Sequence, residues 1–318
     1  MDTRKIGDLD VSTVGIGCNN FGRRLDKSGT EAVVHTAIEV GINFFDTADV
    51  YGDGASEEYL GKALGSRRDE VTIATKFGAE MGGDPRRSGA SPRWIERAVE
   101  DSLMRLGTDR IDLYQLHLPD ENTPIEDTLE TLDRLVSAGK VRQIGCSNYS
   151  EVQIEEALSI SRQRGIARFV SVQNEYSLLH REPEKNGVTE ACLRNGLALL
   201  PYFPLASGML TGKYTRGKEA PAGSRLAGMP ASMADRFVSM RNFDQVERLE
   251  AFAKRRGHTI LELAISWLVA QPLVASVIAG TTSPEQVWIN VDAANWELLP
   301  RRPSRNQQDS SRPLRLRH

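Results

Sequence analysis

Segments typical of β-strands and of α-helices alternate eight times along the 318 residues, and this alternation limits the fold more than any other feature. The strand-like segments are short apolar runs, and the segments between them carry apolar residues at helical spacing. Strands that alternate with helices form parallel sheets with right-handed crossovers. Eight such units in about 290 residues favour a closed (β/α)8 TIM barrel over an open doubly wound sheet. The first strand also lacks the G-x-G-x-x-G sequence of an open dinucleotide-binding sheet.

Local signals place the ends of several elements. Residues 4–14 alternate apolar and polar side chains around a Gly-Asp pair, which predicts an N-terminal β-hairpin. Ser91 and Ser150 each predict the cap of a helix, and Thr30 predicts the cap of an earlier one. The segments that follow strands are the longer ones, so we expect long βα loops, above all at 77–90 and 207–240.

The chain is expected to form one barrel domain over residues 1–299, followed by a different segment at 300–318. That segment holds six Arg, one Asp and few apolar residues, which predicts a disordered Arg-rich tail. The net charge of −3 gives no reason to expect a nucleic acid or membrane partner. No apolar run approaches the ~18 residues of a membrane span.

The chain has three scattered cysteines, Cys18, Cys146 and Cys192. Each lies among apolar residues or glycines, so we expect reduced core residues rather than disulfides. This usage predicts a cytoplasmic protein. The sequence leaves the oligomeric state open.

Four residues with proton-transfer chemistry follow one another at or just after the ends of three successive strands. They are Asp46, Tyr51, Lys76 and His117. In a barrel all strands end at one rim, so these side chains would face a common space. Taken singly, each is more often a packing or surface residue. The four in this order predict a catalytic site.

Their chemistry suits reduction of a carbonyl group. A tyrosine has a pKa of about 10, and the Lys76 ammonium is expected to lower the pKa of Tyr51. Asp46 would keep Lys76 charged, and His117 would orient a carbonyl oxygen toward Tyr51. Together they could protonate a C=O group while another agent delivers hydride.

These four residues, and the motifs around them, resemble the aldo-keto reductases. Phe44-Phe-Asp-Thr-Ala-Asp-Val-Tyr-Gly52 and Asp109-Arg-Ile-Asp-Leu-Tyr-Gln-Leu-His117 carry the four residues. The resemblance covers about residues 4–299 and is closest to the branch that contains bacterial enzymes and channel β-subunits. Its other motifs are Gly15-Ile-Gly-Cys18, Ile144-Gly-Cys-Ser-Asn-Tyr149, Gln173-Asn-Glu-Tyr-Ser177 and Pro204-Leu-Ala-Ser-Gly-Met-Leu-Thr-Gly-Lys-Tyr214.

The resemblance implies a (β/α)8 barrel that binds a nicotinamide cofactor and reversibly reduces aldehydes or ketones. Tyr51 would be the general acid, Lys76 and Asp46 would tune it, and His117 would orient the substrate. Tyr202 would stack on the nicotinamide ring. The other implied cofactor contacts are Ser147, Asn148 and Gln173 for the carboxamide, Leu205, Ser207, Leu210 and Lys213 for the pyrophosphate, and Gly280, Thr282, Gln286 and Asn290 for the adenosine end.

Three departures from the family pattern concern the cofactor and the pocket. Gln286 and Thr281 stand where many NADPH-using relatives carry a basic residue, which leaves NADH as the alternative cofactor. NADPH is still the expected cofactor, because the helix N-terminus expected at 284–286 suits a 2′-phosphate. Phe203 directly follows Tyr202, at a position where the family usually has a small hydroxyl residue. The usual C-terminal loop over the pocket is replaced by the Arg-rich tail.

The substrate is expected to be a small, moderately apolar carbonyl compound, in a pocket lined by Asn20, Phe21 and Phe77. Two other readings remain. One is a cofactor-binding accessory subunit or redox sensor with little turnover. The other is a Schiff-base lyase that uses Lys76, which the nearby carboxylate of Asp46 disfavours. No His-x-His sequence ends a strand, so no metal is expected.

Overall fold

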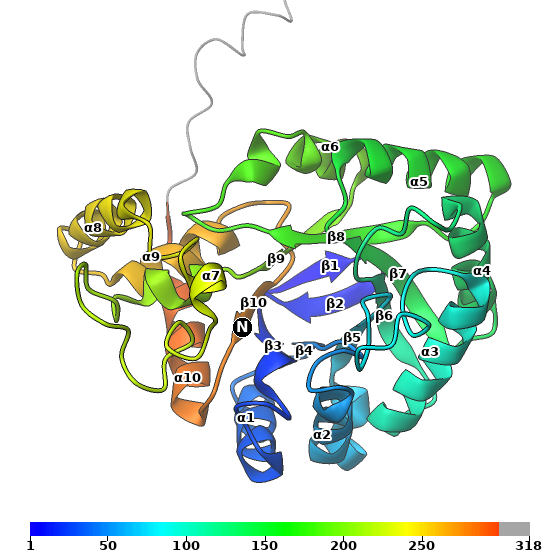
Figure 1. The fold of residues 1–318 in the computed structure, drawn as a ribbon, viewed down its shortest axis with the longest axis horizontal. Coiled ribbons are helices and arrows are strands. Elements are labelled where there is room, and N and C mark those ends of the chain that lie inside the picture. The colour runs from blue at the N-terminus through cyan, green and yellow to red at the C-terminus, as the bar shows by residue number, and fades with distance from the viewer. Residues whose placement is uncertain (299–318) are drawn as a thin grey trace, which may run out of the picture.

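The computed structural model describes residues 1–298, in which eight parallel strands form a nearly closed barrel surrounded by helices (Figure 1). The predicted (β/α)8 TIM barrel is confirmed. The predicted tail, 300–318, lies outside the described residues. The barrel strands are β3 (Val14–Gly17), β4 (Phe44–Asp46), β5 (Thr72–Phe77), β6 (Ile111–Leu116), β7 (Val141–Ser147), β8 (Phe169–Glu175), β9 (Ala198–Tyr202) and β10 (Val277–Gly280).

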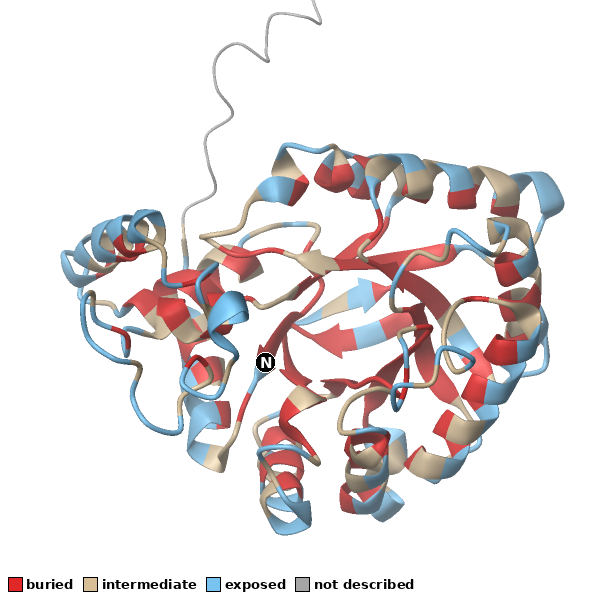
Figure 2. Ribbon diagram, in the orientation of Figure 1, coloured by how far each residue is buried: buried red, intermediate tan, exposed pale blue. Residues whose placement is uncertain are grey.

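Helices occupy the outer layer of the barrel. Their buried faces and the outward side chains of the strands form the main apolar core, as the buried residues in Figure 2 show. The helices are α1 (Lys27–Glu39), α2 (Ala55–Leu64), α3 (Pro92–Leu106), α4 (Ile125–Ser137), α5 (Glu151–Arg164), α6 (Val188–Asn195), α7 (Ala231–Ala234), α8 (Met240–Lys254), α9 (Ile260–Val269) and α10 (Pro284–Asp292). None of the helices in residues 1–298 is long and apolar enough to cross a membrane.

Capping residues set the helix ends, and one expected cap is wrong. Ser91 caps α3, and Ser150 forms a capping box with Gln153 at the start of α5, as predicted. Thr30 does not cap α1 but lies buried within it. The cap is Asp26, whose Oδ1 accepts a hydrogen bond of 2.8 Å from the backbone N–H of Gly29. Helix α1 therefore begins four residues earlier than the expected cap at Thr30 indicated.

The predicted N-terminal hairpin, β1 (Thr3–Ile6) and β2 (Leu9–Ser12), lies across the centre of the strand ring in Figure 1. Its apolar side chains, Ile6, Leu9 and Val11, join the inward side chains of the barrel strands in one buried cluster. The hairpin thus closes the barrel at the end opposite the carboxyl ends of the strands. The other members of the cluster are Phe44, Ala74, Leu113, Val170, Ala198, Leu200, Ala275 and Ile278.

The barrel closes weakly between β9 and β10. No full ladder joins these two strands, and Leu199 alone bridges to the segment before β10. Its N–H donates to Leu273 at 2.8 Å, and its carbonyl accepts from Ala275 at 3.1 Å. The guanidinium of Arg4 braces the same segment, because it donates to the carbonyls of Val274, Gln271 and Val269. The hairpin therefore holds the seam of the barrel as well as its floor.

This arrangement predicts that Arg4→Ala lowers the free energy of unfolding by about 2–4 kcal/mol, because three carbonyls lose a charged donor. The adjacent Lys5→Ala is the matched control. Lys5 pairs with Asp10 at 2.7 Å, but both side chains are 61% exposed, and such pairs contribute about 1 kcal/mol or less. Urea unfolding of both variants measures the difference. Equal losses would contradict the bracing role of Arg4.

Candidate active site

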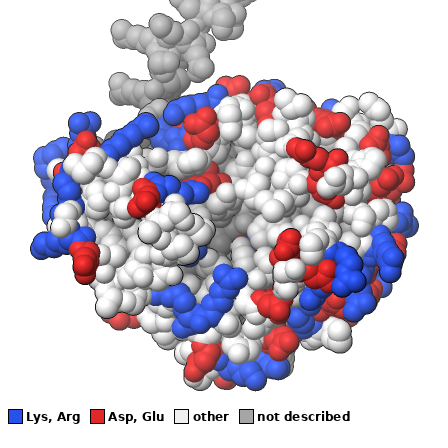
Figure 3. Space-filling model, viewed as in Figure 1, with Lys and Arg blue, Asp and Glu red and all other residues white. Residues whose placement is uncertain are grey.

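A cavity of about 790 Å³ opens at the carboxyl ends of the barrel strands. Figure 3 shows it as a hollow near the centre of the molecule, with Lys and Arg side chains along part of its rim. Its wall is built from strand ends and from the segments that follow β3, β4, β6 and β9. A concave site of this size at this end of a barrel is typical of enzymes with this architecture.

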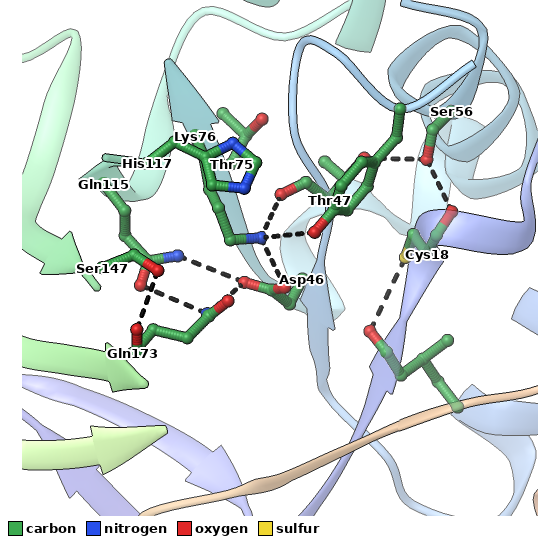
Figure 4. Close-up of polar contacts among 12 residues, drawn as sticks. Cys18, Asp46, Thr47, Ser56, Thr75, Lys76, Gln115, His117, Ser147 and Gln173 are labelled. Atoms are coloured by element: carbon green, nitrogen blue, oxygen red, sulfur yellow. Dashed lines mark hydrogen bonds and ion pairs between the residues drawn. The ribbon is translucent and has the colours of Figure 1, made fainter. Parts of the chain in front are cut away.

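Lys76 lies at the centre of a buried polar cluster below this cavity (Figure 4). Its Nζ donates to Asp46 Oδ2 at 2.6 Å and to the carbonyl of Thr47 at 2.8 Å. The phenol oxygen of Tyr51 lies 3.4 Å from the same Nζ. Lys76 is fully buried, and only 4% of the Asp46 side chain is exposed. The structure therefore brings together the lysine, the carboxylate and the tyrosine that the sequence singled out.

Two glutamines hold the carboxylate of Asp46 from the other side, and one of them was not foreseen. Gln173 Nε2 donates to Asp46 Oδ1 at 2.9 Å, and Gln115 Nε2 donates to the same atom at 3.1 Å. Gln115 pairs in register with Lys76 on the neighbouring strand. It is a polar residue at the inward position two residues after the apolar Leu113, and this was the available signal in the sequence.

Burial, rather than the lysine, decides the protonation of Tyr51. Burial raises the pKa of Tyr51, and the Lys76 ammonium lowers it by less. The expected net lowering is therefore wrong for this structure. Burial alone would lower the pKa of Lys76, but Asp46 and Tyr51 hold it above its usual value. At neutral pH the cluster contains a neutral phenol beside a charged ammonium.

His117 follows β6 and faces Tyr51 across the cavity. The two rings lie edge to face, with centroids 6.0 Å apart. Burial, and then the Lys76 ammonium, lower the pKa of His117 from 6.5 to about 3. Its Nδ1 is buried without a hydrogen-bond partner within residues 1–298. His117 is therefore a neutral imidazole at neutral pH, able to contact a ligand without adding a charge.

The ends of β6, β7 and β9 are joined through Asn148. Its Nδ2 donates to the carbonyl of His117 at 3.0 Å, and its Oδ1 accepts from the Tyr202 hydroxyl at 2.8 Å. Ser147 donates to the carbonyl of Gln173 at 2.7 Å. All five of these residues line the cavity. The hydrogen bond from Tyr202 to Asn148 holds the hydroxyl end of the tyrosine at the cavity wall.

Backbone strain gathers beside this wall. Among the described residues, five other than glycine have a positive φ, and Phe203, Ala206, Ser207 and Asn148 account for four of them. Such conformations cost about 1–3 kcal/mol each and cluster at ligand sites. The hydroxyl oxygen of Ser207 is buried and has no partner within the described residues. The strained backbone and the unpartnered hydroxyl of the segment after β9 therefore indicate a ligand site there.

Most of the residues predicted to bind a cofactor line the cavity, and Leu210 does not. Leu210 is fully buried in the apolar cluster beneath the segment after β9. At the far end, Gln286 Oε1 accepts from the backbone N–H of Thr282 at 2.8 Å. The predicted residues on the cavity wall are Ser147, Asn148, Gln173, Tyr202, Leu205, Ser207, Lys213, Gly280, Thr282, Gln286 and Asn290.

Of the three residues expected in the substrate pocket, Asn20 lines the cavity, and Phe21 and Phe77 do not. Phe77 follows the inward-facing Lys76, so strand alternation turns it outward, where its ring stacks on Tyr114 with centroids 4.6 Å apart. Phe21 is fully buried in the main core. No residue of the expected loop 77–90 lies on the cavity wall.

Three arginines on the cavity wall were missed from the sequence: Arg23, Arg24 and Arg225. They lie on loops whose course could not be read from residue patterns.

Within residues 1–298 no group of three or more His, Cys, Asp or Glu side chains is placed to hold a metal ion. Cys18, Cys146 and Cys192 are buried and unpaired. The expected cytoplasmic location stays a prediction.

Comparisons with known proteins agree with this geometry. The family model described as aldo/keto reductase family matches residues 13–302. An L-glyceraldehyde 3-phosphate reductase of Escherichia coli is 32% identical over 286 residues, which are 87% of this chain and 82% of that protein. Aldo-keto reductase yakc [NADP(+)] of Schizosaccharomyces pombe is 36% identical over 305 residues, 93% of this chain and 87% of that protein. A probable voltage-gated potassium channel subunit beta of Oryza sativa is 35% identical over 291 residues, which are 90% of this chain and 88% of that protein.

The environment of His117 predicts that its imidazole does not titrate near pH 6.5. Nitrogen NMR of the ring is expected to show the neutral form from about pH 8 down to about pH 4. Because the unfolded chain binds this proton first, the contribution of His117 to stability is present above its unfolded pKa of about 6.5 and is lost as the pH falls toward about 3. His117→Gln should therefore flatten the acid-side loss of stability. A ring titration between pH 6 and 7 would contradict this assignment.

Proposed function

Because the chain belongs to the aldo/keto reductase family, we propose that it reduces an aldehyde or ketone to an alcohol with NADPH, and that Tyr51 donates the proton. The observation that carries the proposal is the buried contact of Lys76 with both Asp46 and Tyr51 at the floor of the cavity. The reaction is reversible, since the same groups can take a proton from an alcohol.

The cavity wall offers the groups that a nicotinamide dinucleotide needs. When bound, the nicotinamide supplies the hydride that reduces the carbonyl carbon. Tyr202 lies on the wall with its hydroxyl held by Asn148, and its aromatic ring suits stacking on the nicotinamide. The hydroxyl of Ser147 and the side-chain carbonyl of Asn148 can accept hydrogen bonds from the carboxamide. The unpartnered hydroxyl of Ser207 and the cations Lys213 and Arg225 suit the pyrophosphate.

Tyr51 suits the role of proton donor because its pKa is raised, so the phenol keeps its proton until an acceptor arrives. As negative charge develops on a carbonyl oxygen, the phenol proton moves to that oxygen. The Lys76 ammonium, 3.4 Å from the phenol oxygen, then stabilises the phenolate that remains. Asp46 keeps Lys76 charged and in place through the 2.6 Å ion pair.

His117 orients the substrate in this proposal rather than supplying the proton. A neutral imidazole can donate one hydrogen bond to a carbonyl oxygen and so direct it toward Tyr51. Burial, and then the nearby Lys76 ammonium, disfavour a charged imidazolium, which is why the pKa of His117 is low. The two rings meet edge to face, and both residues line the cavity.

NADPH is proposed over NADH on two grounds. The S. pombe relative is named for NADP(+). In this chain the N-terminus of α10 lies at the far end of the cavity, with Gln286 and Thr282 on the wall, and a helix N-terminus favours an added phosphate. The absence of Lys or Arg from α10 is consistent with weaker discrimination against NADH.

An accessory role is the second candidate, because one relative is named as a probable channel subunit. Such a role needs cofactor binding without rapid turnover. Steady-state rates with a panel of aldehydes separate the two candidates. Tight NADPH binding with no turnover of any aldehyde would favour the accessory role.

Tyr51→Phe is expected to lower kcat by about 100-fold or more, because the substitution removes the proton donor. NADPH binding, followed by the quench of protein fluorescence, should be nearly unchanged. Tyr59→Phe is the matched control, since Tyr59 lies on the outer helix α2 beneath Lys27. If Tyr51→Phe kept more than about a tenth of the wild-type kcat, the acid would have to be another group.

Gln286→Glu is expected to weaken NADPH binding at least about tenfold, because a carboxylate would face the 2′-phosphate. NADH binding should change little. Glu285→Gln, which changes an exposed neighbour on the same turn, serves as the control. Equal weakening of both cofactors by Gln286→Glu would place the 2′-phosphate elsewhere.

A further inference from the structure

The cavity carries more positive charge than the proposed reaction needs. Four cationic side chains line it, and no carboxylate within residues 1–298 forms an ion pair with any of them. The one carboxylate on the wall, Asp46, is already paired with Lys76. The four cations are Arg23, Arg24, Lys213 and Arg225.

Two of the four lie on the segment after β9 and are accounted for by a dinucleotide. Lys213 Nζ lies 5.4 Å from the centre of the Tyr214 ring, and Arg225 lies 4.8 Å from that of Phe203. Both contacts are with neutral rings, so both charges remain for a ligand. A pyrophosphate against this segment would balance them.

Arg23 and Arg24 belong to a different wall, the loop between β3 and α1. Arg24 donates to the carbonyl of Gly223, a neutral partner, and so joins this loop to the segment after β9. Arg23 is exposed at the cavity rim. The pyrophosphate that balances Lys213 and Arg225 leaves these two charges uncompensated.

The loop of Arg23 is fixed against the turn that carries Tyr51. Gly22, at φ +72, approaches α2 so closely that a Cβ on it would lie 2.5 Å from the Cβ of Ala55. A Cβ on Gly52 would lie 3.3 Å from the carbonyl oxygens of Phe21 and Gly22. The arginines directly follow this contact, and Gly52 directly follows the proposed acid. The basic loop is therefore held beside the reacting end of the cavity.

The charges on these loops influence one another. Burial is the main cause that lowers the pKa of Arg225, and the Arg24 guanidinium lowers it further. Tyr51 raises this pKa, and Arg23 lowers it by a smaller amount. Arg225 thus lies within electrostatic reach of both loop arginines and of the phenol. Like charges gathered in a hollow create a positive potential that attracts anions.

We propose that Arg23, supported by Arg24, binds an anionic group on the carbonyl substrate, so that the preferred substrates are small aldehydes or ketones with a carboxylate or a phosphate. This inference rests on the proposed reductase function and deepens it. It replaces the moderately apolar substrate expected from the sequence. Arginine recognises both anions through paired N–H donors, so the two groups share one chemistry.

The test compares substrates that differ in charge but little in shape. One pair is para-carboxybenzaldehyde and its methyl ester, and the other is glyceraldehyde 3-phosphate and glyceraldehyde. The wild-type protein is expected to favour the anionic member of at least one pair in kcat/KM, and added salt should reduce the preference. Which pair shows the larger preference distinguishes a carboxylate from a phosphate.

Arg23→Gln is expected to lower that preference about tenfold, mainly through KM for the anionic member. Lys27→Gln is the matched control, because it removes the same charge four residues along the chain, where Lys27 lies over Tyr59 on the outer surface. The Michaelis constant for NADPH should be the same in Arg23→Gln as in the wild type.

Two results would overturn the inference while leaving the reductase function intact. One is efficient turnover with equal preference for charged and neutral members in the wild type and in Arg23→Gln. The other is a higher NADPH Michaelis constant in Arg23→Gln with unchanged substrate preference, which would assign the cation to the cofactor. Absence of turnover with every carbonyl compound would instead count against the proposed function itself.

Discussion

The buried ion pair between Lys76 and Asp46 is the interaction on which the site depends. Removing two charges from water costs several kcal/mol per ion, and their attraction repays this only with good geometry and further hydrogen bonds. Here β4, β5, β6 and β8 all contribute: they supply Asp46, Lys76, Gln115 and Gln173. Apolar residues could fill the same space with less desolvation, so the charges are explained better by chemistry at Tyr51 than by stability.

The two ends of the barrel have different roles: the hairpin end closes the barrel, and the opposite end holds the cavity. At the floor, the apolar face of the hairpin and the guanidinium of Arg4 seal the barrel and brace its weakest seam. At the opposite rim, positive φ angles, unpartnered polar atoms and unbalanced cations gather around one cavity. Strain and uncompensated charge thus gather at the end where the cavity opens, away from the hairpin. A ligand that carries negative charge and hydrogen-bonding groups would pair with the cations and with the unpartnered polar atoms.

Strand periodicity and motif resemblance predicted the barrel. They also predicted that Asp46, Lys76 and Tyr51 lie together, because the carboxyl ends of barrel strands meet at one rim. The predictions were wrong where a shift of one residue along a strand changes the direction of a side chain, or where the path of a loop decides which residues reach the cavity. Phe77 follows an inward lysine and therefore points out of the barrel. The pKa of Tyr51 depends on burial, which residue order does not reveal. Arg23 and Arg225 meet at the cavity only because two irregular loops converge there.

The most direct test of the account follows a label from cofactor to product. NADPH carrying deuterium at either one of the two hydrogens of its hydride-donating carbon is mixed with the protein and an aldehyde that it reduces. Because Tyr202 covers one face of the nicotinamide in this account, only one of the two labels should appear in the alcohol, at the carbinol carbon. Deuterium transfer from both labels, or from neither while the aldehyde is reduced, would contradict the proposed site.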